Sequence, residues 1–332
     1  MNKKIELGQF FTKKEVWLKK QIIEFIKNSK CRIVYDPFAG QGHLLQVAKN
    51  LGFKKIIGLD IDKNLKWQIN DSLISIPKIK NSIIITNPPY LAKQSATRKK
   101  LTLSKYFNTS IYNDIYLIAL EKMLENHKYV VAIIPESFIN SNFLRKDVLN
   151  SITILEENPF TDTENPVCVV CFDGISKNLN NIKIYKNNIY INNLEEINKI
   201  RLIPSNTVKI KFNDLTGWLG LRAIDSTNDK TFIHFDFKEN FKYDWKNKIK
   251  STSRHFSLIN IDIENNKKQL FIDKSNQLLN EIRIKSQDIL LTPFKGNTKK
   301  GKRRRRLDFN LARAILERIY NEFYEKQQPL LF

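Results

Sequence analysis

The chain has 332 residues, of which 42% are apolar, and a formal net charge of +22 at pH 7. This length suggests two domains, and the apolar content, with 21 Phe, 11 Tyr and 4 Trp, is enough for a sizeable core, which excludes global disorder. No apolar run approaches the ~18–20 residues that span a bilayer, and no signal-peptide core is recognisable. The three cysteines make no disulfide framework, so we expect a cytoplasmic protein without a membrane partner.

The first half of the chain alternates between two patterns. Apolar residues at helical spacing predict helices at 14–28, 43–50 and 111–125. Short β-branched runs predict strands at 32–35, 55–60, 82–86, 129–134, 152–156 and 167–172. We therefore expect an α/β domain with a doubly wound parallel sheet covered on both faces.

Beyond Asp173-Gly174 this alternation fades, and we place a domain boundary near residue 175. Residues 176–332 contain short β-like pieces at 182–185 and 189–191 and end in a helix at 308–325, with one apolar stripe. We expect a catalytic domain at 1–175 and a basic α+β domain at 176–332.

The positive charge indicates a polyanionic partner, because neutralising phosphates releases counterions; a solubilising surface is the alternative. More than half of the excess lies in 177–332, so we expect this half to face the polyanion. The basic run precedes the last helix and is predicted to be an ordered loop that contacts phosphates; its candidates are Lys299, Lys300, Lys302, Arg303, Arg304, Arg305 and Arg306.

A glycine-containing turn follows the first predicted strand, in the segment Asp36-Pro37-Phe38-Ala39-Gly40-Gln41-Gly42. Glycines let the backbone approach a ligand, and the following helix N-terminus favours negative groups. The acidic residue before the loop and the missing third glycine argue against a dinucleotide pyrophosphate site. Asp60, or Asp62, ends the next strand, where a carboxylate can bind both hydroxyls of a ribose; the alternative is a solvated strand-end side chain.

The most specific segment is Thr86-Asn87-Pro88-Pro89-Tyr90, directly after the strand at 82–86. Two prolines fix the backbone and remove two N–H groups, which leaves carbonyl groups pointing outward. The Asn87 amide oxygen and the Pro88 carbonyl can accept both hydrogens of a planar amino group, and Tyr90 offers a ring for stacking. This combination suits an aromatic amine whose nitrogen is to act as a nucleophile.

These segments resemble the gamma-class, N6-adenine-specific DNA methyltransferases of restriction–modification systems, which use S-adenosylmethionine. Asn87-Pro88-Pro89-Tyr90 is similar to their catalytic tetrapeptide, and Asp36 to Gly42 to their first cofactor motif. Gly8-Gln9-Phe10-Phe11-Thr12 matches their N-terminal motif, which lies over the methionine part of the cofactor. The resemblance covers residues 7–172 and implies a Rossmann-like class I methyltransferase sheet followed by a target-recognition domain.

The resemblance also assigns roles to single residues. Asp60 matches the ribose-binding acid, and Asp71, within Asn70-Asp71-Ser72-Leu73, matches the acid that contacts the amino group of the cofactor's adenine. Phe160 is the candidate for packing on the flipped target base together with Tyr90, its alternative being a core Phe at a strand edge. The full set of expected cofactor-binding residues is Phe11, Thr12, Asp36, Pro37, Phe38, Ala39, Gly40, Gly42, Asp60, Ile61, Asp71, Ser72 and Asn87.

We expect no metal site, because Cys168 and Cys171 lack a second pair and would point to opposite faces of a strand. The expected reaction moves a methyl group to N6 of a flipped-out adenine in duplex DNA. The family implies a monomer, and a restriction endonuclease acting on the same site would be a partner. Two alternatives remain open: the same fold acting on cytosine N4, RNA or a protein glutamine, and a catalytically silent DNA-binding homologue.

Overall fold

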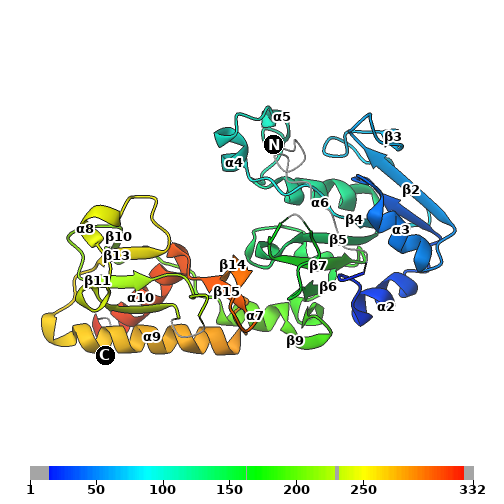
Figure 1. Cartoon of the computed structure of the whole chain (residues 1–332). Helices are drawn as coiled ribbons and strands as arrows, with labels where there is room; N and C mark the ends of the chain where they lie inside the picture. The colour runs from blue at the N-terminus through cyan, green and yellow to red at the C-terminus, as the bar shows by residue number, and fades with distance from the viewer. Residues whose placement is uncertain (1–14, 162, 229–231, 325–332) are drawn as a thin grey trace, which may run out of the picture. The chain divides into compact units, whose positions relative to one another are not determined.

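The computed structural model describes residues 15–161, 163–228 and 232–324. It divides into two compact units, Met1–Glu196 and Ile197–Phe332 (Figure 1). This division lies after the boundary expected near residue 175. The reason is that β8 (Lys183–Lys186) and β9 (Ile189–Asn193) continue the N-terminal sheet, where β8 pairs with β6 (Leu149–Ile154).

Among the described residues, the N-terminal unit contains one sheet in the order β3-β2-β1-β4-β5-β7-β6-β8-β9. Its first five strands are β1 (Ile33–Asp36), β2 (Lys55–Asp60), β3 (Gln68–Ile69), β4 (Ser82–Thr86) and β5 (Tyr129–Pro135), which all run parallel. The predicted α/β class is therefore confirmed, and so is the parallel core of the sheet.

The expected parallel arrangement does not extend to β7 (Val167–Phe172), which runs antiparallel to both β5 and β6. Residues 155–166, between β6 and β7, contain no helix where the structure describes them. Two neighbouring strands joined without a crossover helix must pair antiparallel, whereas the helices between the earlier strands allow parallel pairing.

Helices cover both faces of this sheet. One face packs α2 (Lys20–Asn28) and α3 (His43–Asn50) in a core cluster that includes Ile83, Ile85 and Val131. Strand residues of the opposite parity, such as Ile84, are buried on the other face, and α6 (Ile115–Asn126) packs on β5. Figure 1 shows α3 beside β2, and α6 beside β5.

Shorter helices connect these elements. They are α4 (Lys93–Arg98), α5 (Ser104–Phe107) and α7 (Leu194–Ile200), with 3₁₀ turns at Glu136–Asn140, Lys146–Val148 and Leu179–Asn181. The predicted helices at 14–28 and 111–125 are shorter than expected, since α2 begins at Lys20 and α6 at Ile115.

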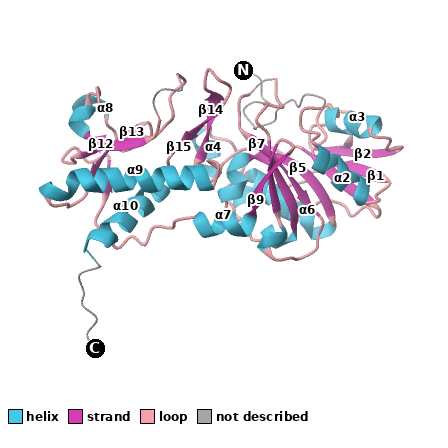
Figure 2. Cartoon of the chain, turned by 90° about the horizontal axis from the view of Figure 1, so that it is seen from below, coloured by secondary structure: helices cyan, strands magenta, loops and turns pink. Residues whose placement is uncertain are grey.

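The C-terminal unit is built on an antiparallel sheet with the order β10-β13-β11-β12. Its strands are β10 (Lys211–Phe212), β11 (Leu219–Arg222), β12 (His234–Phe237) and β13 (Phe256–Asn260), and a separate hairpin pairs β14 (Thr292–Asn297) with β15 (Arg303–Arg306). The helices are α8 (Trp245–Lys248), α9 (Lys268–Lys285) and α10 (Phe309–Tyr324), with 3₁₀ turns at Lys238–Asn240 and Asn265–Lys267. Figure 2 shows α9 as the long helix of this unit. The α10 helix confirms the predicted terminal helix.

None of the described helices combines the length and the apolar character that a membrane crossing requires.

Candidate active site

Three polar side chains meet at the carboxyl ends of neighbouring strands. Asp36 is the last residue of β1, Asp60 is the last residue of β2, and Asn87 directly follows β4. Strand β1 lies between β2 and β4, and all three run parallel. Since the carboxyl ends of parallel strands share one edge of the sheet, residues far apart in the sequence lie together there.

The two acids among these side chains, Asp36 and Asp60, hold the glycine turn after β1. The Phe38 amide donates to Asp36 Oδ1 at 3.0 Å, and the Gly40 amide donates to Asp60 Oδ2 at 2.8 Å. Gly40 and Gly42 have φ values of +51° and +81°, in the left-handed region that favours glycine, and α3 begins directly afterwards. The turn thus depends on Asp60 as well as on its own glycines.

Trp67 is a part of this site that the sequence interpretation missed. Its indole Nε1 donates to the Gly40 carbonyl at 2.7 Å. A Cβ atom added to Gly42 or to Gly58 would lie 2.6 Å from an atom of the Trp67 ring. Both glycines therefore make room for the indole that fixes the loop. A lone Trp outside any motif gave no signal in the sequence.

The two strand-end acids are buried, with exposures of 1% for Asp36 and 7% for Asp60. The alternative of a solvated strand-end side chain is therefore wrong for Asp60. The pKa of Asp36 is raised to about 7, mainly by burial and in smaller part by the nearby Asp60, against hydrogen bonds from Thr86 and Phe38 that lower it. The Asp36 carboxyl therefore titrates close to neutral pH in the folded protein.

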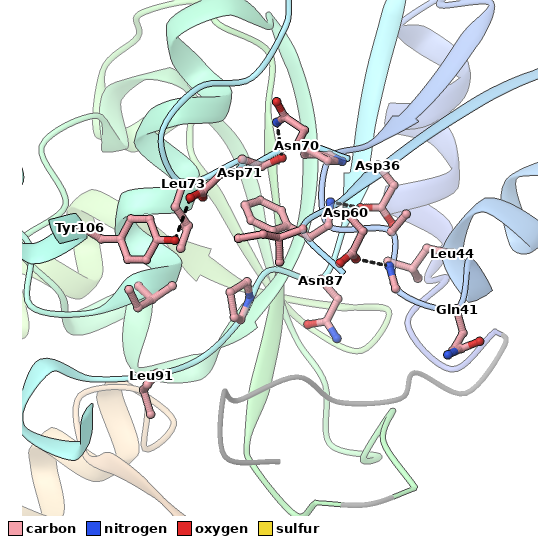
Figure 3. Close-up of a pocket in the computed structure, with 18 of the residues that line it drawn as sticks. Asp36, Gln41, Leu44, Asp60, Asn70, Asp71, Leu73, Asn87, Leu91 and Tyr106 are labelled. Carbon is pink, nitrogen blue, oxygen red and sulfur yellow. Dashed lines mark hydrogen bonds between the residues drawn. The ribbon is translucent and has the colours of Figure 1, made fainter. Parts of the chain in front are cut away.

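Asp71 lies on the opposite side of the pocket from Asp36 and Asp60 (Figure 3). Its Oδ2 accepts hydrogen bonds from Lys105 Nζ and from the Tyr106 hydroxyl, both at 2.9 Å. The bond to Asp71 raises the pKa of Lys105. Both donors lie on α5, so this short helix holds the loop that carries Asp71.

The turn after β4 is tied to the glycine loop and to the neighbouring strand. Thr86 Oγ1 donates to Asp36 Oδ1 at 2.6 Å, so one carboxylate oxygen holds both the glycine loop and the residue before Asn87. The Tyr90 hydroxyl is within hydrogen-bond reach of Asn87 Oδ1 and lies 2.6 Å from the Ile133 carbonyl of β5. Burial raises the pKa of Tyr90 well above its ordinary value, so this hydroxyl stays protonated. These contacts fix the orientation of the Asn87 amide.

Phe160 lies next to Tyr90 in the structure. The two ring centroids are 6.1 Å apart with an interplanar angle of 63°, an edge-to-face contact. Phe160 is only 3% exposed and belongs to the core cluster beneath the site. The structure therefore brings together the two rings that the sequence analysis paired, with Phe160 packed as a core residue.

One pocket of about 190 Å³ connects the glycine turn, the two strand-end acids and Asn87 (Figure 3). The predicted residues that line it are Asp36, Pro37, Phe38, Ala39, Gly40, Asp60, Ile61, Asp71, Ser72, Asn87 and Pro89. Its described lining does not include Gly42, Pro88, Tyr90 or Phe160. The predicted Phe11 and Thr12 lie outside the described residues.

Within the described residues, no group of three or more His, Cys, Asp or Glu side chains is placed to hold a metal ion. Cys168 and Cys171 are free, buried thiols on β7. The chemistry available in the pocket is that of carboxylates, backbone amides and the Asn87 amide.

The basic run in the C-terminal unit differs from the predicted loop. Residues Arg303–Arg306 form β15, and alternation along this strand buries Arg303 and Arg305, which are 9% and 2% exposed, while Arg304 and Arg306 are partly exposed. Its first part, residues 299–302, forms the turn of the hairpin, whereas Arg303–Arg306 is a strand and not a loop. Because Arg303 and Arg305 are buried, their side chains are less accessible to a partner than those of the more exposed residues of the run. Lys299, Lys300 and Lys302 are exposed.

Comparison with protein families finds a match between residues 5–164 and the model described as "Eco57I restriction-modification methylase". This segment contains the strands β1, β2, β4 and β5 and every pocket residue named above. A search of curated proteins finds no match.

Among solved structures, the chain is similar to a modification subunit of a putative type I restriction enzyme from Vibrio vulnificus, with 15% identity over 54% of this chain and 47% of that one, at a TM-score of 0.38. It is similar to the methyltransferase subunit of a type I restriction-modification system from Streptococcus thermophilus, with 17% identity over 53% and 47% of the two chains, at a TM-score of 0.38. A putative RNA methyltransferase from Pyrococcus horikoshii has 18% identity over 51% of this chain and 89% of that one, at 0.34. The match spans about half the length of the two type I subunits.

Proposed function

We propose that this chain is an S-adenosylmethionine-dependent DNA methyltransferase of a restriction–modification system, which methylates N6 of adenine in duplex DNA. The proposal rests on the observation that one pocket is lined by the glycine turn, by Asp60 and by Asn87 of the Asn-Pro-Pro-Tyr turn. The match of residues 5–164 to a restriction-modification methylase family supports the methyltransferase class. The motif order in the sequence supports adenine as the acceptor.

The pocket has the chemistry that this cofactor needs. Asp60 can accept hydrogen bonds from two ribose hydroxyls, since its carboxylate lies at the end of β2 and lines the pocket. Asp71, across the pocket, can accept from an adenine amino group. The cofactor carries positive charge on its sulfonium and ammonium groups, and the carboxylates of Asp36 and Asp60 can supply complementary negative charge, whereas that of Asp71 is paired with Lys105.

We assign the binding of the acceptor amine to Asn87. Its side-chain oxygen, together with the Pro88 carbonyl, would accept the N6 hydrogens and increase electron density on the nitrogen. The Tyr90 hydroxyl, held against Asn87 Oδ1, keeps the amide oxygen pointing in one direction. When bound, S-adenosylmethionine would supply an electrophilic methyl group: the N6–C bond would form as the S–C bond breaks, the electron pair of that bond would remain on the sulfur of S-adenosylhomocysteine, and the methylated nitrogen would lose one proton to solvent.

An adenine inside a duplex must leave the base stack before Asn87 can reach it. Flipping costs a few kcal/mol, and stacking on an aromatic ring returns about 1–3 kcal/mol. We assign this stacking to Tyr90, with Phe160 supporting its ring from the core. The prolines at 88 and 89 hold the turn rigid, so that little ordering is needed when the base arrives.

The remaining roles follow from the same proposal. The basic C-terminal unit would recognise the DNA site, because residues 177–332 carry most of the positive charge. We further propose that the protein is a cytoplasmic monomer that methylates one strand at a time. Its partner would be a restriction endonuclease of the same specificity.

Replacing Asn87 tests the assignment. We expect Asn87→Ala to lower kcat by at least about a hundredfold, because the acceptor nitrogen loses a hydrogen bond that strengthens in the transition state. The dissociation constants for DNA and for S-adenosylmethionine should change little. Methyl transfer from labelled cofactor and the two binding constants measure these effects separately.

The matched control is Asn50→Ala, an exposed asparagine at the end of α3. It should leave all three quantities unchanged. Equal losses of turnover and of DNA affinity in Asn87→Ala would contradict the role we give this residue.

A further inference from the structure

Two arginines of the C-terminal unit, Arg222 and Arg304, lie close together on its surface. Arg222 ends β11 and Arg304 lies on β15, and an isolated bridge between Ile224 and Arg306 joins these segments. The charge of Arg304 lowers the pKa of Arg222, after desolvation as the larger cause. Arg304 is thus near enough to disfavour the charge of Arg222, and the charge of Asp225, which raises the same pKa, offsets part of this effect.

The two guanidinium groups are anchored in the same way. Arg222 Nε donates to the Ile224 carbonyl at 3.3 Å, and Arg304 Nε donates to the carbonyl of the next residue, Asp225, at 2.9 Å. Among the described residues, neither arginine forms an ion pair with a carboxylate, since the Asp225 carboxylate is bound at 2.9 Å by both terminal nitrogens of Arg283. The anchoring through Nε leaves the terminal nitrogens of Arg222 and Arg304 to present to a ligand.

Aromatic rings support both cations. The guanidinium carbon of Arg222 lies 5.5 Å from the Phe256 ring centroid, and that of Arg304 lies 5.0 Å from that of Phe294. Their neighbour His255 contacts the Phe294 ring edge-on, at 5.7 Å between centroids. Stacking on a ring holds the planar guanidinium group in one orientation and lowers the entropy lost on binding.

Arg222 lies on the face of the β10-β13-β11-β12 sheet opposite to α9, together with His234 and Phe256. Cross-strand partners point to the same side of a sheet, and Arg222 is paired with both His234 and Phe256. The other face carries Leu221 and Phe235, which are buried, and Asn276 of α9 bonds the Phe235 backbone. The segment 238–250 packs two rings on this face, because Phe241 stacks on His234 and Tyr243 stacks on Phe256. The same segment carries four exposed lysines, Lys242, Lys246, Lys248 and Lys250.

We propose that Arg222 and Arg304 together clamp a backbone phosphate of the duplex, and that the ring-supported face around them is the part of the C-terminal unit that contacts DNA. A phosphate diester offers two oxygens to two guanidinium groups and cancels the repulsion between them. The proposal rests on the function proposed above, and it moves the DNA contact from the whole basic run to its outward-facing Arg304. The buried Arg303 and Arg305 then support the strand.

The test compares duplex DNA binding by Arg222→Gln, Arg304→Gln and the wild type across a range of salt concentrations, with fluorescence anisotropy as the readout. Each variant should weaken binding roughly tenfold, to the same extent for different DNA sequences, and reduce the slope of log K against log salt by about 1. Arg304→Lys should recover only part of the loss, because an ammonium group keeps the charge but not the anchored planar fork.

Arg318→Gln on α10 is the matched control, since it removes the same charge from an exposed arginine. The midpoint of urea unfolding checks that each variant is folded and should stay unchanged. Wild-type affinity for DNA in Arg222→Gln and Arg304→Gln, or equal losses in Arg318→Gln, would overturn the clamp and leave the proposed function standing. A wild-type protein that does not bind duplex DNA would overturn both.

Discussion

The carboxyl group of Asp36 connects the two halves of the candidate site. One of its oxygens accepts from the Phe38 amide of the glycine loop and from the Thr86 hydroxyl before Asn87. It is buried, and no described residue forms an ion pair with it, so its pKa rises to about 7. Keeping this carboxylate charged in a buried position costs stability of the folded protein. The same negative charge would favour a cationic ligand in the pocket, so stability is given up for binding.

Asp36→Asn tests this account through the pH dependence of stability. Because the pKa of Asp36 is higher in the folded than in the unfolded chain, the folded state binds more protons, and the contribution of this group to the free energy of unfolding falls as pH rises from about 4 to about 7. The amide that replaces the carboxyl group does not titrate, so the variant should lose less stability over this range than the wild type.

Urea unfolding at several pH values between about 4 and 8 measures the difference. The same variant should bind S-adenosylmethionine more weakly above pH 7, since a negative charge is lost. Identical pH dependence of unfolding in the two proteins would show that Asp36 does not titrate as we describe.

At the scale of single elements, the strand ends that carry the site could be predicted from the sequence. Asp36, Asp60 and Asn87 each follow a short β-branched run, and parallel strands bring their carboxyl ends together. The contacts that hold these ends could not be predicted. Trp67, Lys105 and Tyr106 lie in segments without a motif, and only the fold brings them to Gly40 and Asp71.

The same contrast applies to β15. Four consecutive arginines have no apolar periodicity, so their charge suggested an exposed loop. The strand forms because β14 pairs with it and because Asp225 accepts from the Arg305 amide. Tertiary partners decided the structure here, and local sequence preference did not.

Trp67→Phe tests the part that the indole plays in the cofactor loop. Phenylalanine keeps an aromatic ring, but this ring is smaller than the indole and has no donor for the Gly40 carbonyl, so we expect weaker binding of S-adenosylmethionine and a loss of stability of about 1 kcal/mol or more. Gly58→Ala should act more strongly, since its Cβ would lie 2.6 Å from the Trp67 ring and 2.9 Å from Ala39 Cβ.

Trp245→Phe serves as the control for this prediction. Trp245 also donates from Nε1 to a backbone carbonyl, that of Lys238, but in the C-terminal unit. Isothermal titration with S-adenosylmethionine should show a loss for Trp67→Phe and none for Trp245→Phe. Equal affinities in all three proteins would remove Trp67 from the account.

For the whole molecule, the two units divide the charge and the chemistry. The N-terminal unit contains the acidic pocket, and the C-terminal unit contains most of the positive charge together with the arginine pair. The family match covers residues 5–164 and therefore lies within the first unit. The fold class and the pocket could be foreseen because motifs mark them, whereas the sheet of the second unit has no motif and short strands.

The most direct test of the central claim is to incubate the full chain with S-adenosylmethionine and unmethylated genomic DNA and to analyse the digested nucleosides by mass spectrometry. We predict N6-methyldeoxyadenosine, formed by the wild type and almost absent with Asn87→Ala. N4-methyldeoxycytidine in its place would keep the mechanism but contradict the acceptor that we propose. If the protein binds the cofactor and yet forms no methylated deoxynucleoside, the claim that it is a DNA methyltransferase is wrong.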